Sequence, residues 1–221
     1  MVRVHLAPAD RLATATLIEG RLLHVRIFLK RTIDFLIVYQ HAWNPCQGSQ
    51  PLFQKRQQLW LALQNCLNHI PKAHYLIVLG DFNTVLRADP LFVGTEDPRR
   101  LPNVHKDSHV LQQILRSQDL ISVNWKGGYQ NTFSHGTHAS RIDYILIRQP
   151  QVQYRRMKPL TNTQFERNFG ISGPHHHPLL VTLPQWHAPQ PAHFPLNRID
   201  RFAMRHAYHA QLDQWVCFED R

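Results

Sequence analysis

The stretch LIVLGDFNTV, residues 76–85, decides how this chain folds. Its aliphatic run is typical of a strand buried on both faces, and Gly80 then permits a sharp turn or the close approach of another group. Asp81 and Asn83 follow at the carboxyl end of that strand, a favoured position for ligands in open α/β sheets. The alternative is a strand that simply ends in a turn, because Gly, Asp and Asn are common turn residues.

The segments around this stretch predict alternating strands and helices. Apolar periodicity predicts strands over 21–30, 33–39, 75–79, 140–148 and 178–183, and helices over 51–70 and 107–119. Residues 1–20 show no firm period, 84–106 is expected to be a long loop, and 132–139 a turn-rich link. Because the first two strands form a hairpin and few helices separate the others, we expect an α/β fold of mixed sheets covered by helices.

The composition favours a soluble, intracellular protein with a polyanionic partner. The 221 residues carry a formal net charge of +10, for which nucleic acid is the first candidate partner, although a merely basic protein would have the same charge. The three cysteines form no CxxC pair, so a reducing compartment fits better than a disulfide framework. No apolar stretch is long enough for a signal peptide or a membrane helix, and the nucleus is a compatible location.

Polar side chains interrupt the ends of apolar strands at three places. Asp81 and Asn83 follow one strand, Asp143 lies within SRIDY, and His176 lies within PHHHPLL. Phosphodiester hydrolysis needs such a set, because a carboxylate must position or deprotonate water and donors must stabilise charge on the phosphate. A second carboxylate can fix the tautomer of the histidine, and a divalent cation commonly bridges carboxylates and phosphate oxygens.

The order of these motifs resembles the endonuclease/exonuclease/phosphatase superfamily. The matching segments are VYQHAW (38–43), LGDFN (79–83), SRIDYIL (140–146) and HHHPLL (175–180). Within the superfamily, Thr132-Phe133 leading into SRIDYIL is similar to the apurinic-type endonuclease domain of non-LTR retrotransposons. The resemblance implies a four-layer α/β sandwich of two mixed sheets flanked by helices.

The resemblance also implies roles for individual residues. Asp81 matches the aspartate that orients or activates water, and Asn83 the asparagine that holds it. Asp143 matches the aspartate that pairs with the catalytic histidine, and His176 matches that histidine. Tyr39 matches an active-site tyrosine near the phosphate. A Mg²⁺ or Mn²⁺ cofactor is implied, with Asp81, Asn83 and His176 as candidate ligands.

Several of these residues have a structural alternative. Asp143 could anchor a turn, although an unpaired carboxylate in an apolar strand is costly. Tyr39 could be a core aromatic, and Arg141, a candidate phosphate ligand, could form a structural ion pair. Residues 175–177 are all histidines, but adjacent strand residues point to alternate faces and cannot share one ion. The tryptophans Trp43, Trp60 and Trp125 could stack on bases, whereas the helical spacing of Trp60 favours packing.

The chain departs from the family pattern in two ways. His175 replaces the aspartate that normally precedes the catalytic histidine, and no counterpart of the metal-binding glutamate is found before residue 20. The first strands of the domain are therefore expected to be missing, so that 1–186 is an N-terminally incomplete domain. Residues 187–221 are expected to be a Pro-rich linker and a helix over 197–218. Metal binding should be weak, because hard cations prefer oxygen ligands.

The leading functional hypothesis is a metal-dependent DNA endonuclease derived from a retroelement. DNA is the expected substrate, a reverse transcriptase region the expected downstream neighbour, and poor hydrolysis is expected of the chain by itself. One alternative is a non-catalytic nucleic-acid-binding remnant. Another is a different phosphoesterase of the superfamily, such as a deadenylase or a lipid or inositol phosphatase.

Overall fold

The computed structural model describes residues 11–29, 31–43, 50–94, 107–123, 131–135, 137–149, 159–161, 175–176 and 179–181. The elements are β1 (Leu12–Ile18), β2 (Leu22–Ile27), β3 (Ile33–Tyr39), α1 (Gln50–His69), β4 (Tyr75–Asp81), α2 (Ser108–Ser117), β5 (Leu120–Ser122), β6 (Phe133–His135), β7 (His138–Ser140), β8 (Asp143–Arg148), β9 (Pro159–Thr161), β10 (His175–His176) and β11 (Leu179–Val181). They form a six-stranded sheet in the order β1-β2-β3-β4-β8-β5, a three-stranded sheet β10-β6-β7 and a two-stranded sheet β11-β9. The predicted class, α/β with mixed sheets and helices, is confirmed.

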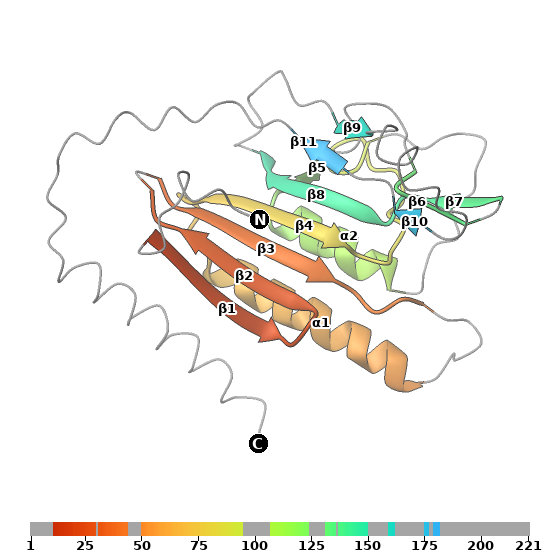
Figure 1. Cartoon of the computed structure of the whole chain (residues 1–221), viewed down its shortest axis with the longest axis horizontal. Helices are drawn as coiled ribbons and strands as arrows, with labels where there is room; N and C mark the ends of the chain where they lie inside the picture. Colours follow the sequence, from red (N-terminus) through yellow and green to blue (C-terminus); the bar gives the residue numbers. More distant parts are fainter. Residues whose placement is uncertain are drawn as a thin grey trace, which may run out of the picture.

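The large sheet brings three strand ends to one place. β3 and β4 are parallel and are connected through α1, so their carboxyl ends lie at the same end of the sheet (Figure 1). β8 is antiparallel to β4 and therefore begins where β4 ends. In the resulting register Tyr39 pairs with Asp81, and Asp81 pairs with Asp143.

Both helices cover the same face of this sheet (Figure 1). The apolar stripe of α1, which includes Leu59, Leu63 and Leu67, packs on alternate strand residues such as Leu36 and Val78. The intervening strand residues, among them Phe35, Ile77 and Ile147, form a second apolar cluster on the other face. Because strand side chains alternate, Tyr39, Asp81 and Asp143 belong to that second face. Neither of the two described helices is long and apolar enough to cross a membrane.

Several strands lie where the sequence predicted none, and β9 is one of them. β1 occupies part of 1–20, β5 follows α2, and β6 with β7 forms a hairpin within the predicted link 132–139. The predicted hairpin of 21–30 with 33–39 is confirmed by the antiparallel pairing of β2 with β3. The predicted linker and helix over 187–221 lie outside the described residues.

The β2–β3 hairpin contains a buried carboxylate, Asp34, at the end remote from Asp81. Asp34 is fully buried, and its oxygens lie 2.6 Å from His24 Nε2, 2.6 Å from Arg26 Nε and 2.7 Å from His74 Nδ1. Burial raises the pKa of Asp34, but the hydrogen bonds from His24 and Arg26 outweigh it, so the pKa falls below the ordinary value. The strand predicted to be almost wholly apolar therefore contains an ionised, fully hydrogen-bonded group.

Candidate active site

Gly80 allows β4 to deliver Asp81 to the site. Its φ is 141°, and an added Cβ would lie 1.9 Å from the carbonyl oxygen of Val38 on the neighbouring strand. Any other residue would push β3 and β4 apart at the pair that precedes Asp81. The glycine in the sequence GDFN is therefore required for close approach of two backbones.

Asn83 fixes the carboxylate of Asp81. The Asn83 backbone N–H donates to Asp81 Oδ1 at 2.8 Å, and its Nδ2 donates to Asp81 Oδ2 at 3.0 Å and to the carbonyl of Gln40 at 2.8 Å. Both partners of Nδ2 are acceptors, which sets the orientation of the amide. Asn83 has a φ of 42°, a left-handed conformation that asparagine tolerates better than most residues.

His176 joins the site from β10, in the three-stranded sheet. Its Nδ1 lies 3.1 Å from both carboxylate oxygens of Asp143, and its ring is 5.0 Å from that of Phe133, the residue opposite it in β6. Because a carboxylate only accepts, Nδ1 carries the proton. The other nitrogen, Nε2, lies 3.9 Å from Asp81 Oδ2, so the imidazole spans the two aspartates.

The start of β8 is held in place by Thr132. Its Oγ1 accepts hydrogen bonds from the backbone N–H groups of Ile142 and Asp143, each at 3.0 Å. Thr132 is fully buried, so this hydroxyl fixes the backbone from which the Asp143 side chain projects.

The electrostatics of the site favour an added positive charge. Burial raises the pKa of Asp81, and the neighbouring charge of Asp143 raises it further, against the opposing effects of the Asn83 hydrogen bonds and of His176. Two carboxylates are thus held close together in partly buried surroundings. A cation between them would favour the ionised forms of both.

The donor set fits a hard divalent cation. One ligand atom each from Asp81, Asp143 and His176 lies within 4.8 Å of the other two. Mg²⁺ is commonly held by one or two carboxylates and keeps several waters, a pattern that this set can supply. The sequence predicted Asp81, Asn83 and His176 as ligands. The structure adds Asp143 to the group, and it commits the Asn83 amide nitrogen to hydrogen bonds, so only the amide oxygen could be a ligand.

A buried ion pair that the sequence did not reveal lies behind the site. Arg56 on α1 is fully buried, and its Nε and Nη2 lie 2.7 Å and 3.1 Å from the two oxygens of Asp107. Nη2 also donates to Thr84 Oγ1 at 2.6 Å and to the Asn83 carbonyl at 3.3 Å, and Nη1 donates to the His41 carbonyl. Arg56 thereby ties the loop of Asn83 to both helices.

The remaining residues that the sequence singled out differ in their exposure to solvent. Tyr39 is 52% exposed, which a core aromatic would not be. Arg141 is only 3% exposed, and its part in phosphate binding stays a prediction. Trp60 is buried and donates its Nε1–H to Asp107 at 2.7 Å, while Trp43 lies 5.9 Å from the Arg56 guanidinium. The side chains of Trp125, His175 and His177 are outside the described residues.

Known proteins resemble the chain in both sequence and fold. The model of the Endonuclease/Exonuclease/phosphatase family matches residues 6–166. An AP endonuclease from Archaeoglobus fulgidus is 18% identical, with a TM-score of 0.55 over 78% of this chain and 70% of that one. The 3′ phosphatase NExo from Neisseria, bound to a product DNA hairpin, is 19% identical, with a TM-score of 0.53 over 74% of this chain. The chain spans 65% of the length of that phosphatase.

The similar structures also include the endonuclease domain of TRAS1, a telomere-specific non-LTR retrotransposon, at 14% identity and a TM-score of 0.45 over 79% of this chain and 70% of that one. No curated protein sequence matches the chain. The family model covers well over half of the sequence, in agreement with the motif order and with the fold. The chain belongs to the endonuclease/exonuclease/phosphatase family.

Proposed function

We propose that this protein is a divalent-metal-dependent hydrolase of nucleic-acid phosphodiesters. The observation that carries the proposal is the grouping of Asp81, Asp143 and His176 at one end of the large sheet. A chain of net charge +10 around such a group suits a polyanionic substrate better than a small neutral one.

The proposed chemistry assigns one task to each side chain. Asp81, held by Asn83, orients a water molecule and accepts its proton as the water oxygen bonds to phosphorus. His176, whose Nδ1–H is held by Asp143, offers Nε2 to the phosphate, where a proton on Nε2 stabilises the developing charge or protonates the leaving oxygen. Exposed Tyr39 borders the same phosphate from β3. A Mg²⁺ held by Asp81 and Asp143, with His176 Nε2 left to carry its proton, would supply Lewis-acid stabilisation of the phosphate oxygens.

The finer proposal is a DNA endonuclease of retroelement origin, with a reverse transcriptase region further along the parent polyprotein. Its support is the order of Thr132-Phe133 and SRIDYIL in the sequence. A second candidate is a protein that binds nucleic acid without cleaving it. The presence of His175 where the family has an aspartate favours this candidate, because it removes an anionic group beside the metal site.

One assay separates these functions. The full chain is incubated with supercoiled plasmid in Mg²⁺, in Mn²⁺ and in EDTA, beside Asp81→Asn and Asp119→Asn. Asp119 is exposed, lies beyond the opposite end of β8 and has a φ of 52°, which asparagine tolerates, so it is a matched control. Metal-dependent nicking that Asp81→Asn lowers about 10²- to 10⁴-fold supports the hydrolase. Gel retardation of the plasmid by the protein, with no nicking in either metal, would support the second candidate, a protein that binds nucleic acid without cleaving it.

A further inference from the structure

An arginine extends the row of side chains that crosses the sheet at the candidate site. The backbone N–H of Tyr39 donates to the Arg21 carbonyl at 2.8 Å, and Tyr39, Asp81 and Asp143 then pair in register across β3, β4 and β8. Paired residues of neighbouring strands project on the same face. Neighbouring strands are about 4.8 Å apart, so the Arg21 backbone lies about 10 Å from that of Asp81.

The Arg21 side chain is held on the tyrosine of this row. Its Cζ lies 4.6 Å from the centroid of the Tyr39 ring, and its Nη1 donates to the Tyr39 carbonyl at 3.5 Å. Contact with an exposed aromatic ring restricts the positions that the guanidinium can take. The guanidinium has five N–H donors in a fork that matches phosphate oxygens, and one of them is used by this carbonyl.

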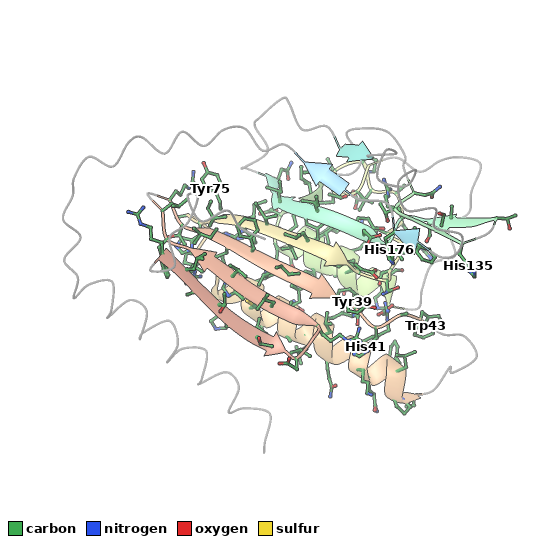
Figure 2. All side chains as sticks on the ribbon, in the orientation of Figure 1. Tyr39, His41, Trp43, Tyr75, His135 and His176 are labelled. Carbon is green, nitrogen blue, oxygen red and sulfur yellow. The ribbon has the colours of Figure 1, made fainter. Side chains whose placement is uncertain are left out.

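The surroundings of Arg21 are cationic. His41, two residues beyond Tyr39, has its pKa lowered by burial first and then by the charges of Arg21, Lys55 and Arg56. Tyr39 and His41 lie at the same end of the sheet as His176 (Figure 2). Because Arg56 is already paired with Asp107, Arg21 and Lys55 are the two of these charges that a bound anion could meet.

We propose that Arg21, stacked on Tyr39, binds a phosphate of the nucleic-acid strand next to the phosphate held at Asp81 and His176. The inference rests on the proposed function, since it takes nucleic acid as the ligand. A single strand laid along the row presents one phosphate per nucleotide, so a second phosphate meets Arg21 when the first is at the aspartates. Arg21 then sets which phosphodiester enters the site, without reading the base.

The test compares Arg21 with an arginine of the same kind at the opposite end of the sheet. Arg31 lies with its Cζ 4.2 Å from the centroid of the Tyr75 ring, and Tyr75 is at the end of β4 remote from His176 (Figure 2). Arg21→Ala and Arg31→Ala therefore remove the same charge and the same stacking contact. Binding of the full chain to a fluorescein-labelled single-stranded oligonucleotide is measured in EDTA by anisotropy over a range of salt concentrations.

We expect Arg21→Ala to weaken binding about three- to five-fold more than Arg31→Ala and to reduce the salt slope by about 0.7, the loss of one phosphate contact. Arg21→Lys should keep the slope, and Arg21→Gln repeats the loss of charge with a polar side chain. Equal effects of the two alanine variants would overturn the inference alone. Absence of binding by the unmodified chain would overturn both it and the proposed function, whereas an Arg21-specific loss without any nicking would overturn only the hydrolase.

Discussion

Asp81 and Asp143 lie opposite each other in neighbouring strands, and the imidazole of His176 spans the two carboxylates. This relationship joins residues from three strands, two in the six-stranded sheet and one in the three-stranded sheet. It places a proton donor directly beside two acceptors. Asp143 therefore decides which ring nitrogen of His176 carries the proton.

Asp143→Asn tests this dependence. The amide can donate to Nδ1, which would move the imidazole proton to Nε2 and remove the charge that stabilises imidazolium. Provided that the chain nicks DNA, we expect the rate to fall about 10²- to 10⁴-fold with little change in binding. The measurement is the nicking rate beside Asp119→Asn, and a rate close to that of the unmodified chain would show that the dyad is not used.

Gly80→Ala should destabilise the protein through one contact. The new Cβ would overlap the Val38 carbonyl, and we expect a loss of about 3 kcal/mol or more in the free energy of unfolding. Gly20→Ala is the control, because Gly20 has a φ of 62° but nothing within 4 Å of an added Cβ, and should cost only about 1–2 kcal/mol. The comparison is made by urea unfolding, and equal losses would mean that backbone conformation, not overlap, sets the requirement for glycine.

Removing one partner of the Arg56–Asp107 ion pair should lower the free energy of unfolding strongly. Asp107→Ala leaves a buried guanidinium without its carboxylate and should cost about 3–5 kcal/mol in unfolding free energy. Trp60→Phe removes only the indole donor to Asp107 and should cost about 1.5–3 kcal/mol. The double variant Arg56→Met, Asp107→Leu should recover part of the loss. A double variant less stable than Asp107→Ala would show that the hydrogen bonds from Arg56 to the site loop dominate.

Asp34 should make the free energy of unfolding depend on pH in the acidic range. Its folded-state pKa lies below the unfolded value, so its stabilisation is fully present above an unfolded pKa of about 3.9 and is lost as the pH falls through the folded pKa. Asp34→Asn should therefore cost about 3 kcal/mol at pH 7, and the difference from the unmodified chain should narrow below about pH 4. Urea unfolding across this range measures it, and a difference that stays constant with pH would contradict the role.

Much of the fold can be predicted from the sequence because long apolar runs identify buried elements. β3, α1 and β4 correspond closely to 33–39, 51–70 and 75–79. β1 was missed because LATATLI contains two threonines and two alanines, which weaken its alternation. β6 and β7 have three residues each, too few for a period to be visible.

The candidate site was predictable only where its residues form motifs. Asp81, Asn83, Asp143 and His176 were found in order, and the structure brings them together, while their catalytic roles remain proposals. Gln40 and Thr132 lie within quoted motifs, but their hydrogen bonds to the site were not predicted, and Arg56 was missed altogether, because hydrogen bonds to backbone groups across the site leave no pattern along the chain. Asp34 was overlooked because a single buried carboxylate in an apolar strand is identified only by its partners elsewhere in the chain, here His24 and His74.

The pairing of Asp81 with Asp143 also predicts how the protein responds to single-codon insertions and deletions in β8. Strand residues alternate between faces, so deleting one codon within β8 would turn Asp143 toward the helices and bring a neighbouring apolar side chain to its place. Tyr144 would lose its buried position, where its hydroxyl donates to the Arg141 carbonyl at 2.6 Å and accepts from the Leu86 N–H at 3.1 Å. Single-codon insertions and deletions in β8 should therefore be far more harmful than most substitutions at exposed positions of the protein.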